Sequence, residues 1–294
     1  MNYKILTDTS SDLPFDVLDS HDISVIGLVV NFDGQEFVED DWKSISADKY
    51  YSAMKNGALP TTSQITPQRF YDYFKPYLEK GLDILYIGFS SSLSGTFGAS
   101  NIAKDMLTKK FPERRIELVD SMSASAGQAL LLLGSAKLKE EGKTMDEVIS
   151  FCEENKMNVN HIFTVDDLNH LRRGGRVSGF SAAMGTMLNI KPILYMSEEG
   201  KLLNIEKVKG RKKSLMTLVD YLEKGSTDQT ADVIIAHGNC EDDAKNLKKQ
   251  IKDRGLSNNV RILTLGMTIG AHTGANVINM VFLGKHREDT VKKN

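Results

Sequence analysis

Three short segments of the sequence concentrate side chains that can bind an anion. They read TTSQ at residues 61–64, SSSLSGT at residues 90–96 and IGAHTGA at residues 269–275, and the last contains His272. Hydroxyl groups and an imidazole can donate hydrogen bonds to a carboxylate or a phosphate without carrying a charge themselves. Any one of these segments could instead cap a helix, as Ser and Thr often do. Together they indicate a site for an anionic ligand.

The same residues also allow a catalytic interpretation. Ser94 could act as a nucleophile with His272 as its base, which would make the chain a stand-alone hydrolase of acyl or phosphate esters. The sequence from Gly88 to Ser92 begins like the nucleophile-elbow motif G-x-S-x-G, but Ser92 stands where the motif has its last glycine. No acid that would orient His272 is evident. We therefore favour binding over catalysis and assign no catalytic residue; a regulatory module with an empty pocket is a third alternative.

Composition argues against several other kinds of site. The chain contains 37 Lys and Arg against 39 Asp and Glu, for a formal net charge of −2, so nucleic acid is not an expected partner. No dinucleotide-binding glycine motif, phosphate-binding P-loop or HExxH motif occurs. Cys152 and Cys240 have no CxxC spacing, and we expect free thiols. We predict no metal and no cofactor other than a bound ligand.

The polar segments must be positioned by the strands and helices around them, and the pattern predicts an α/β fold. Apolar runs typical of strands alternate with longer helical patterns. These runs are YKILTD (3–8), DILYIGF (83–89), RIELVD (115–120), HIFTVDD (161–167), DVIIAHG (232–238), VRILTLG (260–266) and NVINMVFLG (276–284). The first three are followed by the hydroxyl-rich loops TDTSSD, SSSLSGT and DSMSASAG. Ligands of open α/β sheets bind where such loops leave the carboxyl ends of strands.

The length of 294 residues predicts two domains with a ligand site between them. We place the boundary after the helical pattern TMDEVISFCEENK, which gives an N-terminal α/β domain over residues 1–157 and a C-terminal α/β domain over residues 158–294. The first residues lack the apolar core of a secretory signal, and the apolar run ALLLL is far shorter than the roughly 20 residues that span a bilayer. We expect a cytoplasmic protein without stable membrane insertion.

The C-terminal half contains two further kinds of segment that could contribute to a site. NHLRRGGRVSG (169–179) and KVKGRKKS (207–214) are locally basic. FSAAMGTMLNIKPILYM (180–196) is rich in small residues and in Met, which adapts its shape to an apolar ligand. An ordinary amphipathic helix explains the same pattern, so this segment is only a candidate wall for an apolar tail.

In these segments the chain resembles the DegV family, bacterial fatty-acid-binding proteins that include the substrate-binding subunits of fatty acid kinase. The matching segments follow in order along nearly the whole chain, and together they are far more specific than any one of them. They are ILTDTSSDLP, TTSQITP, IGFSSSLSGTF, VDSMSASAGQALLL, LNHLRRGGRVSG, LNIKPIL, GRKKSL and IGAHTGA. The resemblance implies a DegV-like fold in which two α/β domains enclose a ligand tunnel.

The resemblance also implies residue roles. A long-chain fatty acid would lie between the domains, with its carboxylate bound by Thr62, Ser94 and His272. Supporting contacts to the head group or to a partner would come from Ser63, Gly95, Arg173, Arg176 and Arg211. For the arginines, a solvated basic surface is the alternative. In the family, the catalytic subunit of fatty acid kinase is a separate protein that uses ATP to form an acyl phosphate for phospholipid synthesis, so this chain would present the substrate and not react with it.

The sequence departs from the family pattern in two loops. Ile65 stands where the family usually has Pro after T-S-Q, and Ala275 and Asn276 stand where it usually has Pro-Gly after the His-x-Gly of the glycine loop. We expect both changes to loosen their loops and to leave Thr62, Ser94 and His272 in place.

Overall fold

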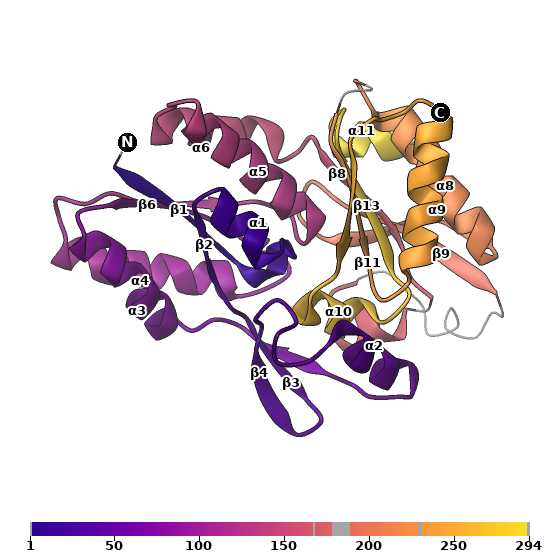
Figure 1. The fold of residues 1–294 in the computed structure, drawn as a ribbon, viewed down its shortest axis with the longest axis horizontal. Coiled ribbons are helices and arrows are strands. Elements are labelled where there is room, and N and C mark those ends of the chain that lie inside the picture. Colours follow the sequence, from indigo (N-terminus) through magenta and orange to yellow (C-terminus); the bar gives the residue numbers. More distant parts are fainter. Residues whose placement is uncertain (1, 167, 178–188, 229–230, 293–294) are drawn as a thin grey trace.

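The computed structural model describes residues 2–166, 168–177, 189–228 and 231–292. These residues form three β-sheets with helices packed on them (Figure 1). The predicted α/β fold class is confirmed.

The first sheet is parallel and brings the three hydroxyl-rich loops to one edge. Its strand order is β2-β1-β6-β7. The strands are β1 (Tyr3–Asp8), β2 (Ile23–Ile26), β6 (Asp83–Gly88) and β7 (Ile116–Asp120). The loops after β1, β6 and β7 hydrogen-bond to one another: Ser125 N donates to Ser10 O at 2.6 Å, and Ser90 N to Ser123 O at 2.9 Å. The predicted convergence of these loops is therefore confirmed, although β2 is not among the predicted strands.

Helices cover both faces of this sheet. The helices are α1 (Phe15–Ser20), α3 (Pro67–Glu79), α4 (Thr96–Lys110), α5 (Ala126–Glu140) and α6 (Met145–Asn155). Helices α3 and α4 share a hydrophobic core on one face, and α1, α5 and α6 lie on the other. In α3 the buried Phe70, Phe74 and Leu78 repeat every four residues, which gives the helix one apolar stripe toward the sheet.

The second sheet is larger and mostly antiparallel. Its strand order is β10-β9-β8-β13-β11-β12. The strands are β8 (Val159–Thr164), β9 (Ile190–Met196), β10 (Leu202–Lys209), β11 (Val233–His237), β12 (Val260–Thr264) and β13 (Ile278–Leu283). Strands β11 and β12 run parallel, whereas the other neighbours pair antiparallel. The outer face is covered by α8 (Arg211–Gly225), α9 (Glu241–Asp253) and α11 (Arg287–Val291).

Strands β9 and β10 are a correction to the sequence interpretation. Residues 190–196, which an amphipathic helix would also have explained, form β9 next to β8. A short continuous apolar run cannot be assigned to a strand or a helix from periodicity alone, and only the pairing with β8 and β10 decides it. Residues 180–188 of the same candidate segment lie outside the described residues.

Helix α5 lies between the two sheets. Its buried residues are spread around the helix: Ala126, Gly127, Gln128, Ala129, Leu131, Leu132, Ser135 and Ala136. The apolar ones among them, apart from Gly127, belong to a hydrophobic core that also contains Leu85 of β6 and Val281 of β13. A helix that is apolar on all sides is typically buried on all sides. The run ALLLL therefore marks the helix that joins the two halves of the molecule (Figure 1).

A small antiparallel sheet, absent from the sequence prediction, holds the TTSQ segment. Its order is β4-β3-β5, with β3 (Val29–Phe32), β4 (Gln35–Val38) and β5 (Thr61–Ser63). Asp33 and Gly34 connect β3 to β4 with φ values of 51° and 73°, as in the two-residue turns that favour hairpins. Helix α2 (Ala47–Lys55) connects β4 to β5.

Three short helices complete the description: η1 (Thr9–Ser11), α7 (Asn169–Arg173) and α10 (Met267–Thr273). Helix α10, which carries His272, packs against β3, β5, α2 and α7. Its first residues are held by two buried carboxyl groups. Asp12 Oδ1 accepts from Gly266 N at 2.9 Å, and Glu39 Oε2 accepts from Thr268 Oγ1 at 2.7 Å. Burial raises the pKa of both carboxyl groups, and the neighbouring Glu39 raises that of Asp12 further.

The predicted domain boundary between residues 157 and 158 falls between α6 and β8 and stays a prediction. Arg287 joins segments from both sides of that position. It is 1% exposed, its Nη1 donates to Met122 O at 3.0 Å and to Ser197 O at 3.1 Å, and its Nη2 donates to Lys156 O.

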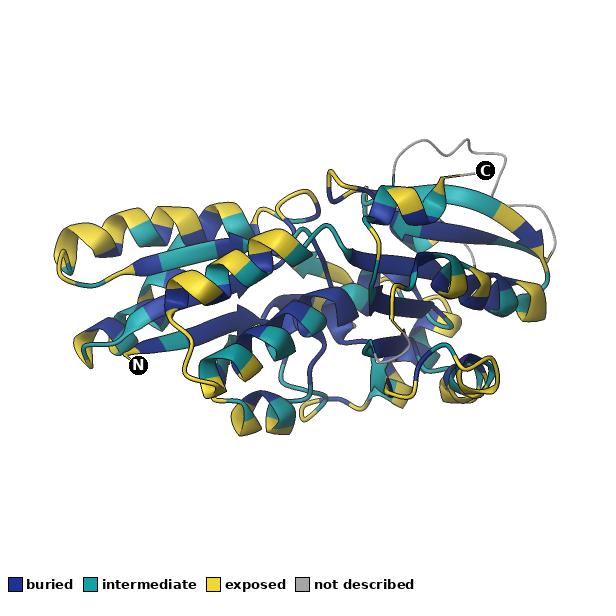
Figure 2. Cartoon of the chain, turned by 90° about the horizontal axis from the view of Figure 1, so that it is seen from above, coloured by how far each residue is buried: buried dark blue, intermediate teal, exposed yellow. Residues whose placement is uncertain are grey.

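Figure 2 shows exposed residues mainly on the outward sides of the helices, with the strands largely buried. In the part of the chain that is described, no helix is both long and apolar enough to cross a bilayer.

The buried carboxyl pair predicts a particular pH dependence of stability. Because folding raises the pKa values of Asp12 and Glu39, the folded chain holds protons that the unfolded chain has released. The stabilisation is present below the ordinary pKa values of 3.8 and 4.5 and is lost as the pH rises through the folded-state values. Asp12→Asn removes one titrating group and tolerates the φ of 55°. We expect its melting temperature to fall less than that of wild type between about pH 5 and about pH 8.

The matched control is Asp33→Asn, since Asp33 is exposed and has a similar φ of 51°. Its melting profile should follow that of wild type. Parallel profiles for wild type and Asp12→Asn, measured by circular dichroism across the same pH series, would contradict the assignment of a raised pKa to Asp12.

Candidate functional site

A cavity of about 260 Å³ lies where the two halves of the chain meet. Ala124, in the loop before α5, and Phe163, on β8, both line it, so its walls come from both large sheets and their loops. Much of the lining is apolar, and it includes Phe89, Leu93, Met196, Leu265, Ile269 and Val277. Such a surface fits an apolar ligand.

The cavity also collects most of the polar residues predicted from the sequence. Thr62, Ser94 and His272 line it, and so do Ser63, Gly95 and Arg176. Ser63 and Gly95 are exposed, so this polar part of the cavity lies next to solvent. Residues that are about 30 to 200 positions apart in the sequence thus come together in one place, as a ligand site requires.

A hydrogen bond between β5 and α10 joins two of the three principal residues. Thr62 Oγ1 and His272 Nε2 are 2.8 Å apart. Thr62 is placed by β5, in which it pairs with Val30 of β3. His272 is placed by α10, which packs against β5. In this pair one atom donates and the other accepts, so the two side chains orient each other.

Burial keeps the His272 imidazole neutral. Burial, together with the nearby Arg176 guanidinium, lowers the pKa of His272 to about 4. The ring also contacts Gly174 closely: a Cβ at that position would be 2.3 Å from His272 Nδ1, so only glycine fits there. At neutral pH the ring therefore offers one donor and one acceptor, and its orientation is fixed from two sides.

Ser94 lies at the start of helix α4. Its Oγ is 2.9 Å from Thr96 Oγ1 and accepts from Thr96 N at 3.2 Å. The amino end of a 15-residue helix carries a partial positive charge that favours an anion nearby. Ser94 is bonded to Thr96, whereas His272 is bonded to Thr62. Among the described residues the nucleophile–base hydrogen bond of the hydrolase alternative is therefore not formed.

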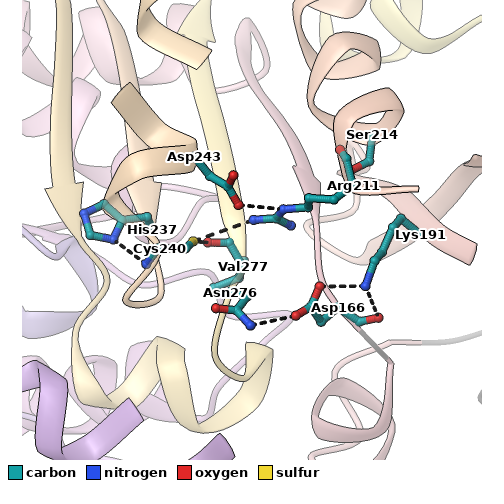
Figure 3. A network of polar contacts seen from close by, with 9 residues as sticks. All are labelled: Asp166, Lys191, Arg211, Ser214, His237, Cys240, Asp243, Asn276 and Val277. Atoms are coloured by element: carbon teal, nitrogen blue, oxygen red, sulfur yellow. Dashed lines mark hydrogen bonds and ion pairs between the residues drawn. The ribbon is translucent and has the colours of Figure 1, made fainter. Parts of the chain in front are cut away.

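The three candidate arginines occupy different environments. Arg176 lines the cavity, its Nε donates to Leu93 O at 3.1 Å, and its Nη1 donates to Gly174 O. Arg173 is exposed on α7, with Nη2 3.0 Å from His170 Nδ1. Arg211 is not among the cavity-lining residues; its Nε donates to Asp243 Oδ2 at 2.8 Å (Figure 3). Only Arg176 is placed to influence a ligand in the cavity directly.

The glycine loop after His272, one of the two departures from the family pattern, is held by hydrogen bonds of Asn276, and the expected loosening stays a prediction. Asn276 has a φ of 61°, a conformation that Asn tolerates better than most residues. Its backbone N donates to Gly238 O at 2.7 Å, and its side chain donates to Asp166 Oδ2 at 2.7 Å. Asp166 is in turn paired with Lys191 at 2.6 Å (Figure 3).

The second departure is also anchored. Ile65 is fully buried, and its backbone N donates to Thr96 Oγ1 at 3.4 Å. A proline at this position could not make that bond because it has no N–H. Thr96 thus connects the TTSQ segment with Ser94. Sequence reasoning gave Thr96 no role, although a second hydroxyl two residues after Ser94 was the available signal.

The loop after β1 has a structural role instead of a ligand-binding one. Asp8 accepts from Tyr86 Oη at 2.5 Å and from Phe89 N at 3.1 Å, and Ser10 Oγ donates to Gln128 Oε1 at 2.8 Å.

Within the described residues no group of three or more His, Cys, Asp or Glu side chains is placed to hold a metal ion. Cys152 and Cys240 are free thiols.

Comparison with known sequences identifies close relatives. A family model described as "Uncharacterised protein, DegV family" matches residues 2–285. A DegV domain-containing protein of Clostridium perfringens is 40% identical over 289 residues, which are 97% of this chain and 99% of that protein. A DegV domain-containing protein of Streptococcus pyogenes serotype M1 is 34% identical over 286 residues, with coverage of 97% and 99%.

Solved structures give the same result. A structure described as fatty acid binding of a DegV family protein from Thermus thermophilus has a TM-score of 0.85 at 28% identity, covering 97% of this chain and 100% of that one. The fatty acid binding DegV family protein of Streptococcus agalactiae has a TM-score of 0.85 at 28% identity, covering 97% and 99%. DegV of Bacillus subtilis, described as a fatty acid binding protein, has a TM-score of 0.79 at 29% identity, covering 97% and 100%.

The environment of His272 predicts its titration. In wild type its imidazole should titrate near pH 4 in an NMR titration of labelled histidine rings. Arg176→Gln should raise the pKa but leave it below the ordinary value of 6.5, because burial is the larger of the two causes. Since folding lowers this pKa, stability contributed by the neutral ring is lost as the pH falls from 6.5 toward 4.

Arg173→Gln is the control for this titration, because Arg173 lies outside the cavity lining and contacts a different histidine. It should leave the His272 signal unchanged. A wild-type pKa near 6.5, or equal effects of the two arginine variants, would contradict this account of the site.

Proposed function

The chain belongs to the DegV family, and we propose that it binds a long-chain fatty acid in the cavity between its two halves. One observation carries the proposal: Thr62, Ser94 and His272 line a cavity whose other walls are mainly apolar. The carboxylate would lie at these three residues and the acyl chain along the apolar walls. The relatives described as fatty-acid-binding proteins at 28% and 29% identity support this assignment.

The two parts of such a ligand would contribute in different ways. An acyl chain gains roughly 0.8 kcal/mol for each buried methylene, on the order of 10 kcal/mol for a long chain before the cost of ordering it. The carboxylate loses several kcal/mol of hydration unless it is hydrogen-bonded again. Each charge-assisted hydrogen bond returns about 1.5–3 kcal/mol. The tail thus supplies affinity, and the polar residues select a carboxylic acid.

A neutral His272 suits an ionised carboxylate. One of the Thr62–His272 pair donates to the other, so the pair has one donor left for the carboxylate and Ser94 adds a second, neither of which buries a charge. The amino end of α4 and the Arg176 guanidinium supply a positive potential. The protein needs no metal and no cofactor for this role, and no residue is assigned a catalytic one.

We further propose that the bound carboxylate is presented to the catalytic subunit of a fatty acid kinase, a separate protein that forms an acyl phosphate with ATP. The exposure of Ser63 and Gly95 beside the polar residues supports this, because a second protein must reach the carboxylate. Exposed Arg173 is a candidate contact for that partner; Arg211, held by Asp243 away from the cavity lining, is a weaker one. A cytoplasmic location goes with this role and is likewise a prediction.

Fatty-acid binding is tested by ligand analysis and by one head-group variant. Purified wild type should contain a long-chain fatty acid in near-stoichiometric amount, identified by mass spectrometry of organic extracts. Thr62→Val removes a hydroxyl from the carboxylate site and should weaken binding of stearate by roughly 10- to 150-fold, the effect of one charge-assisted hydrogen bond. Calorimetry on delipidated protein measures the change.

Thr61→Val is the matched control. Thr61 is the neighbouring residue on β5, is exposed, and is not among the residues that line the cavity. Because Thr61 does not line the cavity, Thr61→Val should bind stearate as wild type does. Absence of lipid in wild type, together with no binding of added stearate, would refute the proposed function.

The division between carrier and kinase has its own test. Loaded wild type with ATP alone should form no acyl phosphate, and addition of a fatty acid kinase catalytic subunit should start the reaction. Arg173→Glu should slow this transfer and leave stearate affinity unchanged, because Arg173 does not line the cavity. Hydrolysis of an acyl ester by the chain alone, abolished in Ser94→Ala, would instead establish the hydrolase alternative.

A further inference from the structure

The cavity contains a second polar position, separate from Thr62, Ser94 and His272. Asn279 of β13 lines the cavity and is 8% exposed. Its Oδ1 atom is buried and has no hydrogen-bond partner among the described residues. Several buried polar atoms of the described residues lack a partner, and among them only Ser125 Oγ and Asn279 Oδ1 belong to residues that line the cavity, where a ligand group can supply the missing hydrogen bond.

The pairing of the strands fixes the direction of this side chain. Asn279 pairs with Phe163 of β8, and Val281 pairs with His161. Paired residues in antiparallel strands share a face, as do residues two apart on one strand. Phe163 and His161 also line the cavity, so Asn279 lies on the cavity face of the second sheet.

That face is otherwise mainly apolar. Val281, Phe163 and Ala236, the residues next to Asn279 on its own and adjacent strands, belong to the hydrophobic core. His161 is the other polar residue of this group, and its Nε2 is 3.1 Å from Ser123 Oγ. The cavity face of β13 thus places the Asn279 amide in a wall that is otherwise mainly apolar. A plain hydrocarbon chain would pack better against this wall if an apolar residue replaced the amide.

Several other polar side chains of the cavity have protein partners. Thr268 Oγ1 donates to Glu39 Oε2 at 2.7 Å, and Thr273 Oγ1 donates to Ile269 O at 2.9 Å. Ser125 also lines the cavity, and its Oγ, like Asn279 Oδ1, is buried without a hydrogen-bond partner among the described residues. Asn279 differs from Thr268 and Thr273 because its Oδ1 has no hydrogen-bond partner in the described part of the chain, and it differs from Ser125 because it lies on the sheet face of the cavity.

We propose that the cavity is built for an acyl chain that carries a hydroxyl group, which hydrogen-bonds to the side-chain amide of Asn279. This inference rests on the proposed fatty-acid binding. A methylene chain packed against Asn279 leaves the amide unsatisfied, which costs free energy. A hydroxyl can donate to the amide oxygen and accept from the amide nitrogen, so it satisfies either end of the side chain. The amide then selects for an oxygenated tail, as the head-group residues select for the acid.

The test compares octadecanoic acid with a positional series of its monohydroxylated forms. Binding to delipidated full-length protein is measured by calorimetry. We expect one isomer, or a few adjacent ones, to bind wild type about tenfold more tightly than octadecanoic acid. In Asn279→Leu, which keeps a similar volume, this preference should be lost and octadecanoic acid should bind at least as tightly as it does to wild type.

Phe163→Leu is the matched control, since Phe163 lies opposite Asn279 on the same face and lines the cavity without a polar group. It should change the affinities of all the acids in parallel and keep the preference for the hydroxylated isomer. If Asn279→Leu does not fold, the wild-type series decides alone. If octadecanoic acid binds and no hydroxylated isomer binds more tightly than it does, the amide is hydrogen-bonded by water or by nothing, and the inference is overturned. If neither class of acid binds, the proposed function itself fails.

Discussion

The burial of α5 between two sheets is the contact on which the rest of the molecule depends. Each large sheet has an apolar face that must be covered, and α5, whose buried residues are spread around the helix, packs against both. The loop that leads into α5 contributes Ala124 and Ser125 to the cavity, and β8 and β13 contribute the opposite wall. The cavity therefore exists because α5 fixes the two sheets at this separation. Arg287 reinforces the arrangement by donating to the carbonyls of Met122, Lys156 and Ser197.

Burial also sets the chemistry of the polar site. Removal from water makes it costly in free energy to bury a carboxylate that has no hydrogen-bond partner. The same effect lowers the pKa of His272 and keeps its ring neutral. A site of neutral donors avoids burying a full positive charge beside the apolar walls, because Thr62, Ser94 and His272 act through hydrogen bonds. The Arg176 guanidinium donates to the carbonyls of Leu93 and Gly174, so it acts on the site through its field and holds the loop that contacts His272.

Local sequence patterns predicted much of the first sheet and little of the small one. β1, β6 and β7 are short segments rich in β-branched and other apolar residues and are followed by polar loops, and both features can be read from a few residues. β3, β4 and β5 have three or four residues each, and their assignment depends on pairing with one another. The hydroxyl-rich loops after β1 and β6 look alike in sequence, yet Asp8 accepts hydrogen bonds from Tyr86 and Phe89 whereas Ser94 lines the cavity. Whether a hydroxyl-rich loop caps a helix or contacts a ligand is decided by its packing against side chains that are distant in sequence.

The two departures from the family pattern show how a backbone constraint can be replaced by a hydrogen bond. A proline restricts the chain before folding, whereas Ile65 leaves it free and instead uses its N–H to reach Thr96 once folded. Asn276 takes the left-handed conformation that a glycine would take, and its side chain adds a bond to Asp166, which glycine could not make. Both replacements connect segments that meet at the cavity: the first joins the Thr62 segment to the Ser94 segment, and the second ties the loop after His272 to β9 through Lys191. The polar residues of the cavity are thereby coupled to both sheets, so a shift of one sheet relative to the other would alter the geometry offered to a carboxylate.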